Sequence, residues 1–286
     1  MNIKLPDINN LLKKMIQATS VFDEEKKTIN DWLQEHRKII KRNLNLLNHR
    51  NEETDIQILL LMMGGLLIRA TRGERGSKVY QELKEKIKCK EDLTKQNYIN
   101  ILKKAQYRWG VKTGVQIISD VVGYFSNTLK WNWKKYFADA EKFRETNFRE
   151  DKLLKIKNIG FKVRDLALSN FSRNYVANDL HVVRVMTRIG LLNYGFDIPF
   201  NEDLEMGNNP GNKKNYLFLH KLVLRLSHLT DDNYLPADLD RIFWHFGRSV
   251  CKNKPKCKSC PINKFCLSGQ SYQSLTIRKI VKDSTK

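Results

Sequence analysis

The hydrophobic positions of this chain recur mainly at spacings of three and four residues, which place side chains on one face of an α-helix. Alternating patterns typical of strands are scarce, and the aromatic segment Trp131–Phe137 fits a helix or loop better than a strand. The pattern predicts an all-α protein. The stretches expected to be helical are Glu24–Leu47, Ile56–Ile68, Val79–Ile87, Tyr98–Gln106, Val111–Phe125 and Leu180–Leu192.

Glycine-containing segments mark the expected turns, at Gly64-Gly65, Arg72–Gly76 and around Pro210. The polar segment Gly207–Asn215 is expected to be a surface loop, and the tail from Ser268 onward is too polar for the core. No internal repeat is visible. The longest apolar run, Ile56–Ile68, spans about 13 residues and fits a buried helix better than a bilayer span. The first 17 residues lack the features of a secretory signal, so we expect a cytoplasmic protein with no membrane segment.

The charge of the chain is strongly positive. Its 286 residues suffice for about two domains. Its 52 basic and 31 acidic residues leave a formal net charge of +21. Such a surface attracts polyanions, although a composition rich in lysine, isoleucine and asparagine can also reflect genome base bias. Charge therefore indicates a class of partner and not a reaction.

Four of the five cysteines form the most specific pattern, C-x5-C-x2-C-x5-C, at Cys251, Cys257, Cys260 and Cys266. Zinc ribbons usually split their ligands into two C-x2-C pairs, whereas this run has one such pair between two longer intervals. That asymmetry favours a four-iron, four-sulfur (4Fe-4S) cluster. Zinc and four unligated thiols are the alternatives. Cys89 has no partner at a ligand spacing and is expected to be an ordinary or exposed thiol.

Lysines surround these cysteines, and no acidic residue lies between Cys251 and Cys266. A loop held by a metal centre can present its ammonium groups to a phosphate backbone. We therefore predict that Lys254, Lys256 and Lys258 contact a phosphate backbone. A solvated run of charge is the alternative.

A second candidate site lies at residues 153–162, where LLKIKNIGFK leads into an apolar-periodic helix. This pattern predicts a helix, a tight hairpin and a helix. Asn158 and Gly160 tolerate left-handed or tight backbone, and exposed amides before a helix bind phosphate. Ile156, Asn158 and Gly160 are the predicted phosphate contacts of this hairpin. A generic interhelical turn is the alternative.

Three ordered segments resemble the endonuclease III family of helix-hairpin-helix DNA glycosylases. They are IKNIGFK, NDLHVVRV at 178–185, and HFGRSVCKNKPKCKSCPINKFC at 245–266. The family pattern reads LPGVGxK, VDTHxxRV and C-x6-C-x2-C-x5-C. This chain departs from it at Lys157, Asn158, Asn178 and Leu180, and its first cysteine interval is one residue shorter. These departures remove no reacting group but weaken inference about the substrate. The similarity covers about residues 50–270.

The resemblance implies a two-lobed all-α fold with DNA in the cleft. A six-helix barrel lobe, residues 50–173, would end in the helix-hairpin-helix motif. The N-terminal helices, residues 1–49, would pack with the cluster lobe, residues 174–270, and residues 271–286 form a basic tail. It also implies a monomer, associated with the nucleoid, that binds double-stranded DNA containing a damaged, mismatched or modified base.

The same resemblance implies the catalytic groups. Lys162 occupies the place of the family's catalytic lysine and Asp179 that of its aspartate. The amine would attack the sugar, expel the base and form a Schiff base, while the carboxylate stabilises positive charge on the sugar. Together they imply a bifunctional glycosylase that nicks the strand by β-elimination. A phosphate contact for Lys162 and an N-cap role for Asp179 are the alternatives. His181 and Arg184 are expected to support the fold.

Reaching a base inside a duplex requires flipping the nucleotide out, and the gap must be filled. Arg69, in a segment similar to the Gln-Ala-Thr wedge of the family, is the candidate, with Arg72 and Arg75 nearby for phosphates. Solvated arginines are the alternative. For Tyr107, Arg108 and Trp109, aromatic core packing is favoured over contact with the lesion.

Two other function classes stay open. One is a noncatalytic iron–sulfur DNA-binding protein, and the other is a monofunctional mismatch glycosylase. The presence of Lys162 and the lack of a further recognition domain after the cysteines argue against the second. Oxidised pyrimidine is the default substrate by resemblance, while oxidised guanine, products of cytosine deamination or methylation, and a virus-modified base remain open.

Overall fold

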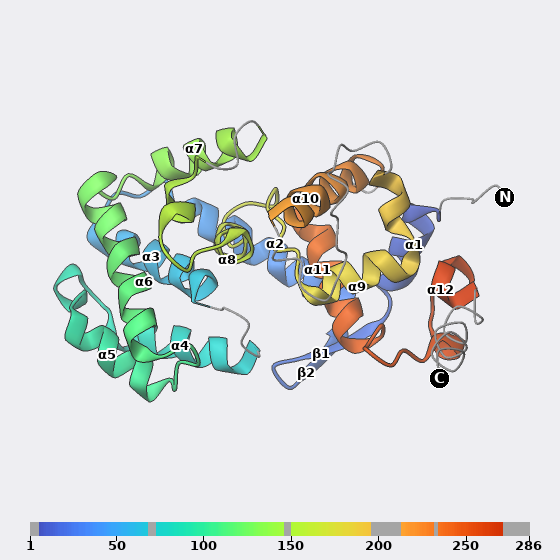
Figure 1. Cartoon of the computed structure of the whole chain (residues 1–286), viewed down its shortest axis with the longest axis horizontal. Helices are drawn as coiled ribbons and strands as arrows, with labels where there is room; N and C mark the ends of the chain where they lie inside the picture. Colours follow the sequence, from blue (N-terminus) through green and yellow to red (C-terminus); the bar gives the residue numbers. More distant parts are fainter. Residues whose placement is uncertain (1–5, 68–72, 146–149, 196–212, 232–233, 271–286) are drawn as a thin grey trace, which may run out of the picture. The chain divides into compact units, whose positions relative to one another are not determined.

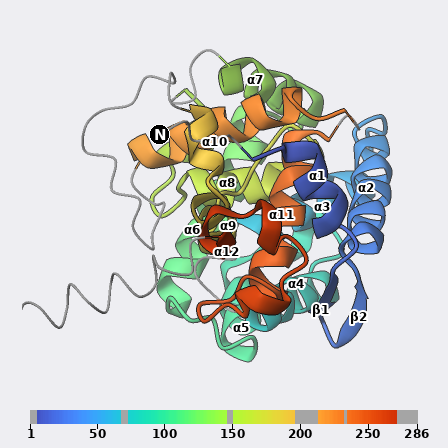
Figure 2. The same cartoon turned by 90° about the vertical axis from the view of Figure 1, so that its right-hand side faces the viewer.

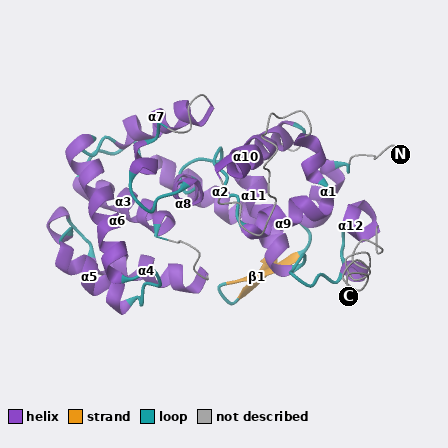
Figure 3. Ribbon diagram, viewed as in Figure 1, coloured by secondary structure: helices purple, strands orange, loops and turns teal. Residues whose placement is uncertain are grey.

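The computed structural model describes residues 6–67, 73–145, 150–195, 213–231 and 234–270. Across these ranges the chain forms twelve α-helices, several short 3-10 or π turns and one two-stranded sheet (Figures 1 and 3). The all-α class predicted from the hydrophobic spacing is confirmed. Among the described residues, no helix combines the length and the apolarity that crossing a bilayer requires.

The chain divides into two compact units. Residues Lys38–Ala177 form one, and Met1–Arg37 together with Asn178–Lys286 form the other. One boundary therefore falls inside helix α2 (Ile29–Leu46), and the other falls directly before Asn178. The N-terminal residues belong to the same unit as the cysteine-rich segment.

The unit formed by residues 38–177 packs around α3, most of whose residues are buried. A Cβ added at Gly65 on α3 would lie 2.4 Å from the Cα of Ala167 on α8, so these two helices meet at backbone contact. This contact requires glycine and fixes α8 against the core. The elements are α3 (Glu52–Leu66), α4 (Gly73–Lys86), η1 (Lys90–Asp92), α5 (Lys95–Lys104), α6 (Val111–Gly123), η2 (Tyr124–Thr128), α7 (Trp133–Glu145), η3 (Lys152–Lys155) and α8 (Phe161–Leu168).

The other unit packs around α11. Arg37 of α2 donates two hydrogen bonds of 3.1 Å to the buried carboxylate of Asp238 on α11, a bidentate pair that ties the N-terminal segment to the C-terminal one. Its elements are α1 (Ile8–Met15), β1 (Thr19–Phe22), β2 (Glu25–Thr28), α9 (Leu180–Ile189), η4 (Leu191–Gly195), α10 (Lys213–His228), α11 (Pro236–Ser249), η5 (Cys257–Ser259), η6 (Asn263–Phe265) and α12 (Leu267–Gln270).

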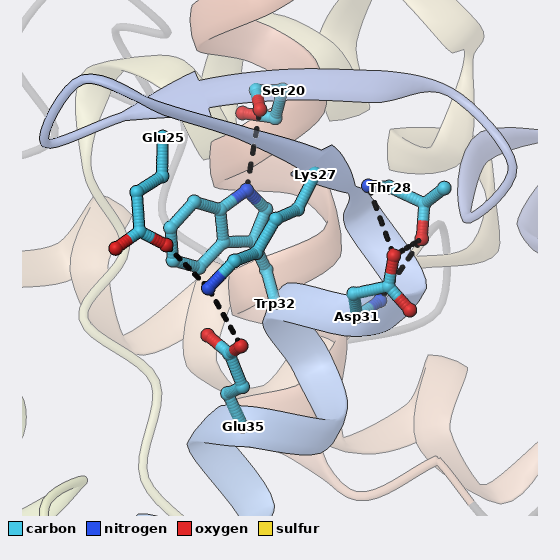
Figure 4. A network of polar contacts seen from close by, with 7 residues as sticks. All are labelled: Ser20, Glu25, Lys27, Thr28, Asp31, Trp32 and Glu35. Atoms are coloured by element: carbon cyan, nitrogen blue, oxygen red, sulfur yellow. Dashed lines mark hydrogen bonds and ion pairs between the residues drawn. The ribbon is translucent and has the colours of Figure 1, made fainter.

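The expectation of a helix from Glu24 is wrong, because Glu25–Thr28 pairs antiparallel with Thr19–Phe22. Asp23 and Glu24 both have positive φ, at 48° and 67°, which closes a two-residue hairpin turn. The helix begins only after Thr28, whose hydroxyl and backbone exchange hydrogen bonds with Asp31 (Figure 4).

The hairpin is held by both polar and aromatic contacts. Ser20 is fully buried, and its hydroxyl shares hydrogen bonds with His245 Nδ1 at 2.9 Å and Ser249 Oγ at 2.8 Å. The Trp32 indole donates to the carbonyl of Ser20, and Lys27 lies over the Trp32 ring between two glutamates (Figure 4). The first strand is therefore attached to α11.

Several predicted turns and one predicted tail need correction or lie outside the described residues. The turn expected at Gly64-Gly65 is wrong, because both glycines lie inside α3, where Gly65 allows the close contact with α8. Of the turn expected at 72–76, residues 73–76 are helical and belong to α4, and of the loop expected at 207–215, residues 213–215 belong to α10. Residues 268–270 form part of α12, and Gly269 is packed against Asn263, so this segment is not a free polar tail. Residues 68–72, 207–212 and 271–286 lie outside the described residues.

Candidate functional site

The hairpin between η3 and α8 is a turn closed by the Ile159 amide, which donates to the Ile156 carbonyl at 3.1 Å. Asn158 has a φ of 74°, so the predicted left-handed residue is confirmed. Gly160 has a φ of −106° and a ψ of 174°, an extended backbone that does not use the freedom that glycine has to adopt positive φ. A Cβ on Gly160 would meet nothing within 4 Å, which leaves the backbone open at this point. The first arm is a 3-10 turn of four residues.

Lys162 is the second residue of α8 and is partly buried. No side chain caps this helix, whose N-cap is Gly160. The first amides of a helix carry partial positive charge and bind anions when no side chain accepts from them. Lys162 is therefore next to a group of donors suited to a phosphate.

A buried ionic network lies beneath the hairpin. Arg164 is fully buried, and its guanidinium contacts Asp151 at 3.0 Å and Asp165 at 2.6 Å. The Tyr136 hydroxyl donates to Asp151 at 3.2 Å, and the guanidinium lies over the Tyr175 ring. Burial would lower the pKa of Arg164, but the carboxylates of Asp165 and Asp151 raise it above its ordinary value. Burial likewise raises the pKa of Tyr136, with Asp151 adding to the effect.

The sequence does not predict this network, because the helix after the hairpin has an apolar-periodic pattern that hides its charged residues. Asp151 also caps η3 by accepting the Leu153 amide at 2.9 Å. The same carboxylate thus joins the first arm of the hairpin to Arg164 on the second. Adjacent opposite charges inside an apolar-periodic helix were the available signal.

Asp179 caps α9. Its Oδ1 accepts the His181 amide at 2.7 Å and the Val182 amide at 3.2 Å, so the N-cap role expected for this residue is present. Asp179 belongs to the unit that contains residues 178–286, and Lys162 belongs to the other. Asn178 is fully buried, and neither its Oδ1 nor its Nδ2 has a hydrogen-bond partner among the described residues.

Arg184 connects α9 to α11 and the cysteine loop. Its guanidinium contacts His181 Nδ1 at 2.7 Å and donates to the carbonyls of Gly247 at 2.7 Å and Cys251 at 2.9 Å. Burial lowers the pKa of His181, and Arg184 acts in the same direction. These bonds agree with the expectation that both residues support the fold.

The four cysteines line one pocket at the ends of α9 and α11. The apolar wall includes Ile189, Phe246, Val250 and Ile262. Arg188 donates to Cys251 Sγ at 3.6 Å and to the Lys252 carbonyl at 2.6 Å, and the Cys266 thiol donates to the Arg188 carbonyl at 3.3 Å. Thiols gathered on an apolar pocket with donors to sulfur fit an iron–sulfur cluster.

The thiols also interact with one another. Burial raises the pKa of Cys260 to about 11, and the other three cysteines contribute to this rise. Burial also raises the pKa of Cys266. A cationic metal centre would reverse this preference, because ligation requires thiolates. Lys254, Lys256 and Lys258 on the same loop are exposed, as contact with phosphate would require.

The remaining residues singled out in the sequence differ in how the structure places them. Arg69 and Arg72 lie outside the described residues. Tyr107 is buried, as core packing predicts, but Trp109 is 37% exposed with the Arg108 guanidinium 5.4 Å from its ring, so the core role is wrong for this pair. Cys89 is partly exposed, and a hydrogen bond to Glu91 raises its pKa.

No family model and no curated protein matches the chain. Solved structures are similar in fold. A trapped endonuclease III–DNA covalent intermediate, an estranged-adenine complex, is 19% identical, with 83% of this chain and 97% of that chain covered and a TM-score of 0.46. A non-covalent endonuclease III–DNA complex is 19% identical, with coverage of 87% and 99% and a TM-score of 0.49. A thermostable thymine-DNA glycosylase is 17% identical, with coverage of 83% and 97% and a TM-score of 0.48.

Proposed function

We propose that this protein is a base-excision repair enzyme, a bifunctional DNA glycosylase and AP lyase. The observation that carries the proposal is the position of Lys162, in the first turn of a helix that no side chain caps and directly after an open hairpin backbone. An amine beside a phosphate-binding turn can reach a deoxyribose. The Asp179 cap at the start of α9 and the four-cysteine pocket support the same proposal.

In the proposed reaction, damaged DNA binds through phosphates to the hairpin amides and to Lys254, Lys256 and Lys258. The target nucleotide leaves the stack, which costs a few kcal/mol and is easiest for damaged or mispaired bases. The neutral amine of Lys162 adds to C1′ as the bond from C1′ to the base breaks, and the base leaves with a proton. Asp179 stabilises the positive charge that builds on the sugar.

The second step cuts the strand. In the adduct between Lys162 and C1′, the bond from C1′ to the ring oxygen O4′ breaks, and O4′ takes up a proton from Asp179 or water. The product is an open-chain protonated Schiff base, which acidifies the C2′ proton. Loss of that proton expels the 3′ phosphate by β-elimination, and water then releases the amine. Asp179 is the carboxylate proposed to hold or move protons in these steps.

Cys251, Cys257, Cys260 and Cys266 would hold a 4Fe-4S cluster. The cluster would supply rigidity to the basic loop through four bonds from metal to thiolate. Arg188 and the apolar wall would surround it. We further propose that the protein acts as a monomer on double-stranded DNA in the cytoplasm, at the nucleoid.

The test is borohydride trapping on a duplex with a single abasic site and on duplexes that carry single damaged bases. We expect a covalent protein–DNA adduct that disappears in Lys162→Ala and persists in Lys155→Ala, a lysine on the exposed first arm of the same hairpin. Base release without an adduct or strand cut would identify a monofunctional glycosylase. Binding without base release or an adduct would identify a noncatalytic DNA-binding protein.

A further inference from the structure

Helices α9 and α11 pack against each other (Figures 1 and 2). At the start of α9, the His181 ring is 6.3 Å from the Trp244 ring, and a Cβ on Gly247 would lie 2.7 Å from the His181 carbonyl. One turn further along, Arg184 contacts Gly247 and Cys251. Each step forward on α9 is thus matched by a step forward on α11 and the segment that follows it.

The same register places Arg241 beside Asp179. One helical turn before Trp244 on α11 is Arg241, and just before His181 at the start of α9 is Asp179. The electrostatics agree with this placement. Burial lowers the pKa of Arg241, while the carboxylates of Asp240 and Asp179 act in the opposite direction.

Arg241 differs from other arginines of this unit in its hydrogen bonding. Arg37, Arg184 and Arg188 all donate hydrogen bonds within this unit. Within the described part of the chain, no group accepts a hydrogen bond from the Arg241 guanidinium, although the residue is partly buried, as judged by its exposed surface. A guanidinium carries five donors and a permanent charge, and partial burial without an acceptor is costly. An anionic ligand would supply the acceptors.

We propose that Arg241 binds a phosphate of the DNA backbone next to the nucleotide whose sugar Asp179 stabilises. This inference rests on the proposed function. In the free protein the charge of Arg241 offsets that of Asp179. A bound phosphate takes up the guanidinium charge, so the full negative field of Asp179 then acts on the sugar, where positive charge develops. Substrate binding and transition-state stabilisation are coupled through one arginine.

The test uses a duplex with a single tetrahydrofuran abasic analogue, which binds without reacting. Affinity is measured from low to moderate salt for the natural protein, Arg241→Gln, Arg241→Lys and the control Lys221→Gln, which removes one charge from an exposed position on α10. We expect Arg241→Gln to weaken binding roughly tenfold and to reduce the slope of log K against log salt by about 0.9. Arg241→Lys and Lys221→Gln should retain the slope. Thermal unfolding of each variant should match the natural protein.

Duplexes with one neutral methylphosphonate in place of a phosphate locate the contact. The natural protein should lose affinity at one position beside the analogue, and Arg241→Gln should lose nothing further there while remaining sensitive elsewhere. Equal sensitivity at every position, or an unchanged salt slope, would overturn the Arg241 inference alone. If the natural protein binds neither this duplex nor damaged DNA, the proposed function itself fails.

Discussion

The guanidinium of Arg164 donates a 3.0 Å hydrogen bond to the carboxylate of Asp151, and this bond joins the two arms of the hairpin that carries Lys162. Both side chains are buried. A buried charge pair adds little net stability over an apolar pair of the same shape, but removing one partner leaves an uncompensated charge. The pair therefore restrains the geometry of the hairpin more than it adds to the free energy of folding.

Replacing Arg164 with alanine should lower the free energy of unfolding by about 3–5 kcal/mol, because Asp151 and Asp165 would be left buried without their cation. Chemical denaturation measures the loss. Lys135→Ala, which removes an exposed i,i+4 pair with Asp139, should cost no more than about 0.5 kcal/mol. Equal small losses in both variants would contradict a restraining role for the network.

His245 should make stability depend on pH. Burial lowers its pKa to about 3 in the folded protein, against an ordinary value of 6.5. The unfolded chain therefore binds a proton that the folded chain does not, and stability falls as pH drops from 6.5 towards 3. The slope due to this group is about 1.4 kcal/mol per pH unit.

The measurement is the free energy of unfolding at pH 7.5, 6 and 5 for the natural protein and for His245→Gln, which can still bond to Ser20. The difference between the two proteins should shrink as the pH falls. A difference that stays constant with pH would show that folding does not lower the pKa of His245.

Replacing Asn178 with leucine should raise the free energy of unfolding by about 1–2 kcal/mol, because the buried amide has no partner among the described residues and a side chain of similar shape carries no desolvation cost. The matched control is Asn170→Leu, which removes a 3.2 Å hydrogen bond to the Leu61 carbonyl and should destabilise. Thermal or chemical unfolding distinguishes the two. Destabilisation by both variants would mean that the Asn178 amide is satisfied.

The purified protein should show a broad visible absorption band and contain iron and inorganic sulfide. Cys260→Ala should lose the band, while Cys89→Ala should retain it, because Cys89 lies outside the four-cysteine pocket. A colourless protein with one zinc per chain would show that the pocket holds zinc instead.

Local signals predicted much of the site. The backbone at Asn158, the cap at Asp179 and the spacing of the cysteines all depend on residues within a few positions of one another, so they are visible in the sequence. The start of α2 was not predicted correctly. Glu25–Thr28 contains only polar residues, which fit the exposed face of a helix as well as a strand, and hydrophobic spacing does not report the turn at Asp23 and Glu24.

Polar contacts between segments that are distant in the sequence could not be predicted from local signals. Arg164 and Asp165 follow one another in the chain, but their burial depends on Asp151 and Tyr136 on other elements. Arg241 becomes notable only when the register of α9 against α11 places it beside Asp179. Such roles depend on packing between segments that are far apart in the sequence.

The hydrogen bond between Ser20 and His245 spans 225 positions of the chain. During synthesis, the first strand leaves the ribosome long before its partner helix exists. The segment from Lys38 to Ala177 can collapse on its own while translation continues. The unit formed by residues 1–37 and 178–286 can fold only after its C-terminal segment has been synthesised. A nascent chain stalled at residue 200 should therefore display a protected middle and a protease-sensitive amino terminus.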